Sequence, residues 1–217
     1  REVVRIEEAR LVEDFARDGT LEQARLLGIS GSLAATNALI EQLQVDPDGV
    51  ATVGLEMIPP EVRTEAILHR LDQASEDKLA PLLILLPRLQ SRRAIEAVGE
   101  LLVHPDGEVK AAAADVLGRA DTAVALEVLE SLRSRPEARL GVALAYGRLG
   151  SSRCTPLVQM LRDPDPAVRA AAAEGTGRCD LATVPELSAI LRDETDPTAA
   201  RALVRALGQI GGDEAVS

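Results

Sequence analysis

The sequence predicts an all-α fold built from about seven repeated helical hairpins. Three observations support this prediction: a motif that recurs at a fixed distance, apolar residues spaced as on one face of a helix, and a core composition with almost no aromatic side chains. A fixed internal period outweighs local features, because each repeat is one supersecondary unit that stacks on the next.

Two segments that lie 59 residues apart are nearly the same. "HPDGEVKAAAADVLGRAD" (residues 104–121) and "DPDPAVRAAAAEGTGRCD" (residues 163–180) share a proline, a valine, a basic residue, four alanines, an acid and a Gly-Arg pair, all in step. A further copy lies about halfway between them, and weaker copies lie nearer the N-terminus. The anchor positions, which are glycine in most copies, are 28, 56, 87, 118, 147, 177 and 208, at spacings of 28 to 31 residues.

The sequence pattern of each repeat predicts two helices. In the stretch from Val168 to Gly175, apolar and small residues follow the i, i+3, i+4, i+7 spacing of one helix face. An Asp-Pro step precedes this stretch, and it suits a helix start, with Asp as the N-cap and Pro in the first turn. The anchor glycine falls near the end of the first helix, where it permits close packing or a left-handed exit. Gly150 or Asp180 then makes the turn to a second apolar helix.

The alanines of the motif are expected where the first helices of neighbouring repeats meet. The chain has no Trp, and its only other aromatic residues are Phe15 and Tyr146. A core of Leu, Val, Ile and Ala requires its elements to approach closely, and small side chains allow this.

The pattern D-P-x-x-V-R-x-A-A-A-x-x-x-G-x-x-D, followed by a second apolar helix, resembles the short HEAT-like repeats of the phycobilisome-lyase type. The resemblance covers residues 21–217, with the last repeat truncated. It implies a right-handed α-α superhelix of the HEAT/armadillo kind, with first helices on the convex side and second helices lining the concave side. Residues 1–20 do not follow the pattern, and we expect a capping helix there, with a linker helix as the alternative.

The composition excludes several classes of protein. A net charge of −11 argues against a general nucleic-acid binder, which must neutralise phosphates with Lys and Arg. No run of 18 apolar residues occurs, so no membrane span is expected. Lys78 and Lys110 are the only lysines among 24 basic residues, which suggests a GC-rich bacterial genome. The chain starts at Arg1 and stops within a repeat, so we expect a fragment of a longer protein.

The two cysteines are expected to be reduced. Cys154 and Cys179 are too few for a disulfide framework, and each falls in an apolar column of the repeat. This predicts two core residues of a cytoplasmic protein, since thiols stay reduced in that compartment.

No catalytic, metal-binding or cofactor-binding motif is apparent. His69 and His104 fall in different repeats, and neither is followed by Glu. Deoxyhypusine hydroxylase, which is built on similar repeats, is marked by His-Glu pairs. The cysteine spacing does not match that of a zinc site, and the glycines are dispersed at anchors rather than gathered in a phosphate loop. We therefore expect no catalytic residue, no metal and no cofactor.

One basic column is the candidate binding site for a partner. The residue after the anchor is arginine in four consecutive repeats. These residues are Arg88, Arg119, Arg148 and Arg178. A stripe of this kind suits an acidic peptide, whereas two structural roles compete with it: capping of helix C-termini and an ion-pair ladder with Asp121 and Asp180. A second column, formed by Lys110, Arg139 and Arg169, is expected to pair with the Asp that starts the helix.

These features predict a non-catalytic scaffold or regulatory module that binds a partner along its concave surface. The partner would be another protein or an adjoining domain of the same longer chain. The alternative is an enzyme or enzyme subunit of the chromophore-lyase type that holds a small molecule in the concave groove. A deep pocket with convergent polar groups would favour the enzyme, and a shallow, charged, continuous surface would favour the scaffold.

Overall fold

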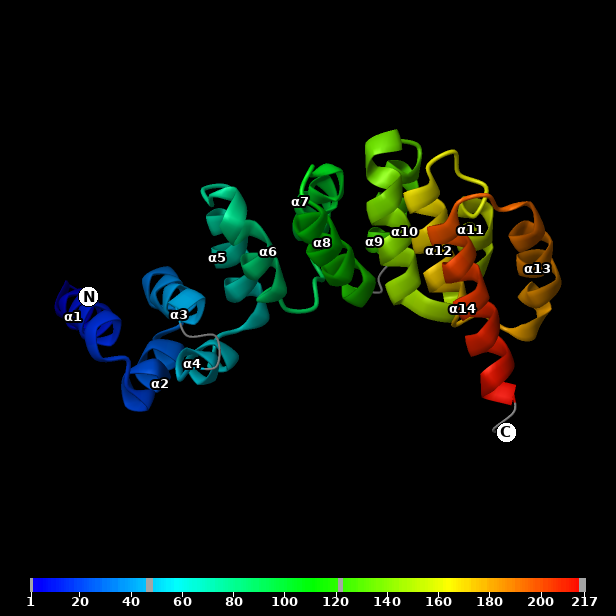
Figure 1. The fold of residues 1–217 in the computed structure, drawn as a ribbon. Coiled ribbons are helices and arrows are strands. Elements are labelled where there is room, and N and C mark those ends of the chain that lie inside the picture. Colours follow the sequence, from blue (N-terminus) through cyan, green and yellow to red (C-terminus); the bar gives the residue numbers. More distant parts are fainter. Residues whose placement is uncertain (1, 46–48, 121–122, 215–217) are drawn as a thin grey trace. The chain divides into compact units, whose positions relative to one another are not determined.

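A computed structural model describes residues 2–45, 49–120 and 123–214, which contain fourteen α-helices, four short 3-10 helices and no strand (Figure 1). The chain forms two compact units, Arg1–Arg88 and Leu89–Ser217. The first holds α1 (Glu2–Asp18), α2 (Leu21–Ser30), α3 (Leu33–Val45), α4 (Ala51–Met57), α5 (Pro60–Leu71) and α6 (Glu76–Ile84). The second holds α7 (Arg92–Glu100), η1 (Leu101–Val103), α8 (Gly107–Ala120), α9 (Ala123–Arg133), η2 (Pro136–Ala138), α10 (Arg139–Leu149), η3 (Gly150–Arg153), α11 (Cys154–Met160), α12 (Pro166–Thr176), η4 (Leu181–Thr183), α13 (Val184–Asp193) and α14 (Pro197–Glu214).

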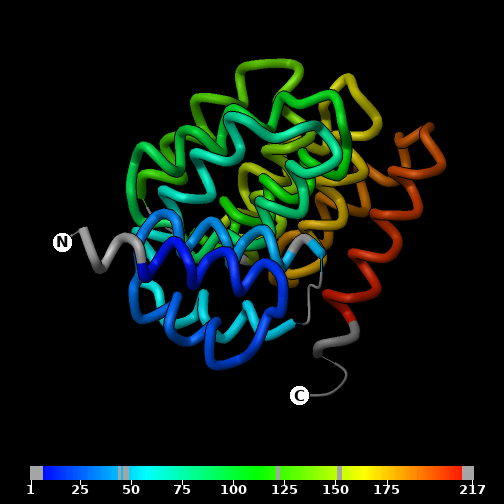
Figure 2. Tube along the Cα trace, turned by 90° about the vertical axis from the view of Figure 1, so that its left-hand side faces the viewer, coloured from blue at the N-terminus to red at the C-terminus, as the bar shows by residue number. Residues whose placement is uncertain are grey.

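The helices alternate between two layers within each unit. The even-numbered helices are the predicted first helices of the repeats, and the odd-numbered helices from α3 onward are the second helices. In the first unit α2 packs on α4, and α3 packs on α5. In the second unit α8, α10, α12 and α14 pack on one another in sequence, and Figure 2 traces the chain as it passes back and forth between the layers. The predicted all-α fold of repeated helical hairpins is confirmed.

The N-terminal helix α1 packs on α2 and α3 within the first unit. It therefore takes a place in the layer of odd-numbered helices, although its sequence does not follow the repeat. The boundary at residue 20 and the capping role remain predictions.

The predicted helix starts are present. Asp165 is the N-cap of α12, and its carboxylate accepts from the backbone N–H of Ala167 at 2.8 Å, with Pro166 in the first turn. Asp196 precedes α14 in the same way and accepts from the N–H groups of Thr198 and Ala199, both at 2.9 Å. Each carboxylate satisfies backbone donors that the first turn of a helix leaves free.

The anchor glycines permit close packing of neighbouring first helices. A Cβ atom on Gly28 would lie 2.5 Å from the carbonyl oxygen of Gly54, and one on Gly147 would lie 3.1 Å from the Cα of Gly175. In both cases the contacted residue lies two places before the next anchor, so the predicted register holds in both units. Gly177 ends α12 with a right-handed φ of −59°, whereas Gly150 ends α10 with a φ of 75°. Close packing, rather than a left-handed exit, is therefore the role of these anchors.

The last two alanines of each motif are core residues. Ala113, Ala114, Ala172 and Ala173 are at most 1% exposed, whereas Ala111 is exposed. Small residues on facing helices bring the backbones together, as the composition predicts.

The even-numbered helices of the second unit form a continuous layer. Each of α8, α10, α12 and α14 packs directly on the next, while α11 and α13 pack chiefly on the even-numbered helices and α9 packs on α7 and α10. The small residues on the even-numbered helices allow this close packing. The placement of first helices on the convex side and of second helices on the concave side stays a prediction.

The anchor at Pro87 departs from the pattern. Helix α6 ends at Ile84, so Pro87 and Arg88 lie in the connection to α7 and not at a helix end. Proline lacks the N–H group that a helix interior needs, and it disfavours helical geometry in the preceding residue.

The expectation of two reduced cysteines is wrong. Cys154, at the start of α11, and Cys179, just after α12, form a disulfide with a Cα–Cα distance of 5.7 Å. The hairpin of α11 and α12 folds back on itself and so joins residues 25 positions apart. Because disulfides persist in oxidising compartments, this bond gives no support to a cytoplasmic location.

Within the described ranges, none of the helices combines the length and the apolar character needed to traverse a bilayer.

Candidate functional site

Two arginines of the predicted column meet at one carboxylate. Arg119 lies near the end of α8, and its Nε is 3.1 Å from Oδ2 of Asp115, one turn earlier in the same helix. Arg148, near the end of α10, places its Nε 3.3 Å from Oδ1 of the same residue. The side chains of Arg119 and Arg148 are 46% and 57% exposed, so each ion pair is worth at most about 1 kcal/mol.

The third arginine, Arg178, follows α12 and has a neutral partner. Its Nη1 donates to the backbone carbonyl of Gly147 at 2.9 Å. The acceptor is in the preceding repeat, so Arg178 does not cap its own helix. Among the residues that the structure describes, no carboxylate compensates its charge.

The anchor glycines set the positions of these arginines. A Cβ atom on Gly118 would overlap the Cβ of Arg148, and one on Gly177 would overlap the amide oxygen of Gln209. Gln209 occupies the same place in its repeat as the arginines, directly after an anchor. Arg148 and Gln209 therefore lie over the preceding anchors, where the missing side chain leaves room for them, whereas a Cβ atom on Gly147 would meet Gly175 and not Arg178.

An open depression of about 470 Å³ crosses the surface of α10, α12 and α14. It is lined by Leu144, Gly147, Arg148, Ala171, Glu174, Gly175, Gly177, Arg178 and Gln209. Two cations and one acid line it, and the acid, Glu174, pairs with Arg205 of α14 at 3.3 Å. We refer to this site as the arginine-lined depression.

The fourth arginine of the predicted column, Arg88, lies outside this site. It belongs to the connection between α6 and α7 in the first compact unit, where its side chain is exposed. The structure thus groups Arg119 with Arg148, and Arg148 with Arg178, within the second unit.

The predicted ion-pair ladder takes a different form. Asp121 lies outside the described residues, and Asp180 accepts from the backbone N–H of Ala182 at 3.1 Å. The carboxylate that the arginines share is Asp115.

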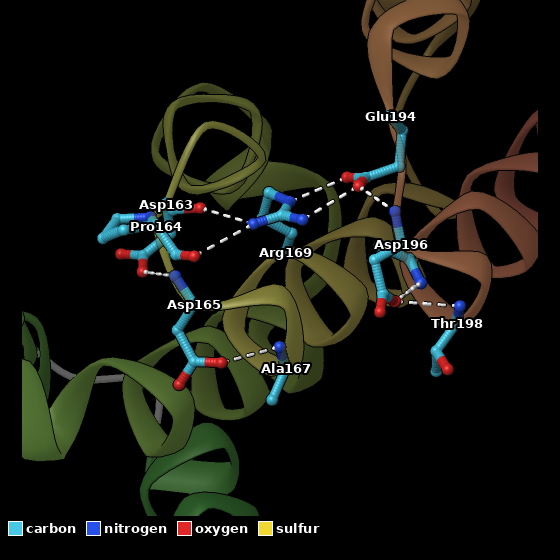
Figure 3. Close-up of polar contacts among 9 residues, drawn as sticks. Asp163, Pro164, Asp165, Ala167, Arg169, Glu194, Asp196 and Thr198 are labelled. Carbon is cyan, nitrogen blue, oxygen red and sulfur yellow. Dashed lines mark hydrogen bonds and ion pairs between the residues drawn. The ribbon is translucent and has the colours of Figure 1, made fainter.

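The second basic column joins successive repeats. Arg169 of α12 donates to both carboxylate oxygens of Glu194, at 2.7 and 2.8 Å, and to the carbonyl of Asp163 at 2.9 Å (Figure 3). Arg139 pairs with Asp163 at 3.1 Å. Each arginine thus binds an acid in the turn of the following repeat, rather than the acid that caps its own helix. Lys110 occupies the equivalent place in α8.

The ion pair of Arg169 and Glu194 is well shielded from solvent. The carboxylate side chain of Glu194 is only 3% exposed. Hydrogen bonds from the Arg169 guanidinium, together with the backbone N–H of Asp196, lower the pKa of Glu194 to about 2, against the opposing effect of burial. The same contact raises the pKa of Arg169. This geometry indicates a structural clamp, not a binding site.

The acids of the odd-numbered helices are largely neutralised by arginines. The pairs are Glu41 with Arg70, Glu96 and Glu127 with Arg92, Glu130 with Arg133, and Glu186 with Arg162. These acids therefore form ion pairs within the chain.

The first unit has a more apolar depression. It measures about 680 Å³ and lies between α3 and α6. Its lining is Glu41, Leu43, Val45, Asp77, Lys78, Pro81, Ile84 and Leu85, and Val45 and Ile84 are 80% and 67% exposed.

The two histidines and Tyr146 have partners within the chain. His69, in α5, lies 3.4 Å from Gln73, and Nδ1 of His104 accepts from the N–H of Asp106 at 3.1 Å. The hydroxyl of Tyr146 is buried and donates to Glu130 at 2.7 Å, and burial raises its pKa. Within the described residues no group of three or more His, Cys, Asp or Glu side chains could hold a metal ion.

Comparison with known proteins identifies the repeat at the C-terminal end. Residues 154–217 match the family model of HEAT repeats. The predicted resemblance to HEAT-like repeats is confirmed there, and the hairpins before residue 154 keep the same anchor register.

Two crystal structures of engineered proteins are similar to the chain. One is 18% identical, with a TM-score of 0.41, and the match covers 95% of this chain and 97% of that one. The other is 19% identical, with a TM-score of 0.40 and coverages of 94% and 98%. No curated protein matches the chain.

Sequence reasoning did not assign three residues of the site. Asp115 and Glu174 occupy equivalent positions in two repeats, three residues before an anchor. The recurrence of an acid at this position could therefore have identified them. Gln209 follows the last anchor, so in the last repeat it occupies the position that the arginines hold in earlier repeats.

Proposed function

We propose that the chain is a non-catalytic interaction module that binds a protein partner through the arginine-lined depression. The observation that supports this proposal is the character of the surface. It is open, and it carries the charged side chains of Arg148, Glu174 and Arg178 together with the amide of Gln209 from α14.

The layer on which the depression lies also supports the proposal. Repeat proteins bind partners on extended surfaces that several successive repeats form together. The even-numbered helices of the second unit form one continuous layer, and the arginine-lined depression crosses three of them. The odd-numbered helices instead carry acids that are already paired within the chain.

The test is capture of partners from a cell lysate with matched variants. The triple variant Arg119→Glu, Arg148→Glu and Arg178→Glu reverses charge at the site. The control variant Arg162→Glu and Arg192→Glu reverses charge on the odd-numbered layer. The proposal requires a protein that is bound by the wild type and the control but lost by the triple variant, with unchanged helical circular dichroism. Equal capture by all three chains would contradict it.

The apolar depression of the first unit favours the alternative, a small-molecule site in an enzyme or enzyme subunit. Its exposed aliphatic lining suits an apolar molecule, and its charged groups are Glu41, Asp77 and Lys78. Anilinonaphthalene sulfonate is a suitable probe, because its fluorescence rises in apolar sites. Binding that Ile84→Glu abolishes, combined with failed capture of any protein, would favour this alternative.

A further inference from the structure

We infer that the arginine-lined depression takes an acidic, extended segment whose carboxylates are spaced about three residues apart. This inference rests on the proposed function and specifies the chemistry of the partner.

The charge of the depression differs in sign from that of the chain. The chain carries a net charge of −11, yet Arg148 and Arg178 line the depression against the single acid Glu174. Glu174 is itself paired with Arg205. The cationic site therefore favours carboxylates locally, whereas the acidic surface elsewhere on the chain does not attract them.

The internal partners of the two arginines leave them able to bind a ligand. Arg148 shares Asp115 with Arg119, so one carboxylate serves two guanidinium groups. Arg178 donates to a carbonyl oxygen through Nη1 alone. A guanidinium has five N–H donors in a planar fork that fits a carboxylate bidentately, so each side chain keeps donors for an incoming acid.

The spacing follows from the stacking of the helices. Arg148 and Arg178 come from the neighbouring packed helices α10 and α12, whose axes lie about 10 Å apart. In a polyproline II segment, every third side chain falls on one edge, about 9 Å from the last. Gly147, Gly175 and Gly177 also line the depression, but Gly175 and Gly177 are buried and Gln209 covers Gly177, so the segment binds through the arginines rather than through the glycine backbone.

Carboxylates fit this site better than a phosphate backbone does. Binding of nucleic acid gains most of its affinity from many neutralised phosphates, and a chain with this net charge repels a polyanion outside the depression. A short acidic peptide presents its charge only where the arginines lie.

The test is peptide binding measured by fluorescence anisotropy with the full chain. The probe is a labelled peptide of four Glu-Pro-Ala repeats. Controls replace every Glu by Gln or by Lys, or gather the four Glu residues into one block, and a thymidine oligonucleotide of equal charge is the polyanion control. The site variant is Arg148→Gln with Arg178→Gln, and the matched variant is Arg162→Gln with Arg192→Gln.

We expect the Glu-Pro-Ala peptide to bind the wild type and the matched variant, and to bind the site variant about tenfold more weakly or not at all. Rising salt should weaken binding. Equal binding of the Gln or Lys peptide, equal binding by the site variant, or tighter binding of the oligonucleotide would overturn the inference. Equal binding of the block peptide would overturn the three-residue spacing. If the acidic peptide fails while lysate capture still depends on the three arginines, the inference falls and the proposed function stands.

Discussion

Arg148 lies directly on Gly118. A Cβ atom at residue 118 would overlap the Cβ of Arg148, and it would lie 3.1 Å from its Cγ and 3.2 Å from the carbonyl oxygen of Ala145. The glycine of one repeat thus makes room for the arginine of the next. The anchor Gly118 and the candidate binding residue Arg148 therefore form one packing contact.

Gly118→Ala should therefore destabilise the second unit. The added methyl group meets the rigid start of a side chain and a backbone carbonyl, and overpacking of this kind costs about 1–3 kcal/mol. Gly208→Ala is the matched control, because none of the described residues lies within 4 Å of a Cβ there. The control should gain up to about 1 kcal/mol from helix propensity. Urea unfolding of both variants measures the difference, and equal stabilities would contradict the packing rule.

Glu194→Gln should change how the free energy of unfolding depends on pH below about pH 5. The folded pKa of about 2 lies below the usual value of a glutamate, so the wild type gains stability from this group above about pH 4.3 and loses it as pH falls toward 2. The variant should be less stable than the wild type at pH 7, and the gap should narrow as pH falls from 5 to 2. Unfolding measured at several pH values checks this.

The control for that experiment is Glu186→Gln, which removes an exposed ion pair with Arg162. It should leave the stability at pH 7 nearly unchanged, since exposed pairs are worth little. If the gap between wild type and Glu194→Gln stayed constant across this pH range, the clamp would not have the electrostatic role assigned to it.

Reduction of the disulfide should lower the stability of the second unit. The bond closes a loop with a sequence separation of 25, for which the chain-entropy model gives about 3 kcal/mol. Thermal melting with and without dithiothreitol measures the loss. The double variant Cys154→Ser with Cys179→Ser should melt like the reduced chain and should not respond to the reductant. A wild type that melts identically in both conditions would show that the bond does not form.

Tyr146→Phe should cost about 1 kcal/mol. The change removes one buried hydrogen bond to Glu130 and leaves the ring in place. Glu130 still forms its ion pair with Arg133 at 3.2 Å, so its carboxylate is not left without a partner. Chemical denaturation followed by circular dichroism measures the change, and a loss above about 3 kcal/mol would point to a larger network than the one observed.

The repeat was predictable because it depends on spacing. The anchors from Gly28 to Gly208 mark the helices of both units, with the exception of Pro87, and the Asp-Pro steps mark the helix starts at Asp165 and Asp196. Each of these signals lies within a short stretch of sequence and has a known structural role: Asp-Pro starts a helix, and glycine allows two helices to pack closely.

The partners of side chains across repeats were not predictable in the same way. Arg148 reaches Asp115 and Arg169 reaches Glu194 only through the stacking of neighbouring hairpins. The disulfide was missed for the same reason, since its two cysteines occupy unrelated places in their repeats.

The most direct test of the central claim is a nuclear magnetic resonance titration of the 15N-labelled chain with the Glu-Pro-Ala peptide. We expect the largest chemical-shift changes at the Nε–H groups of Arg148 and Arg178 and at the amides of Gly147, Gly175 and Gly177. Shifts confined to α9, α11 and α13, or to the apolar depression of the first unit, would contradict it.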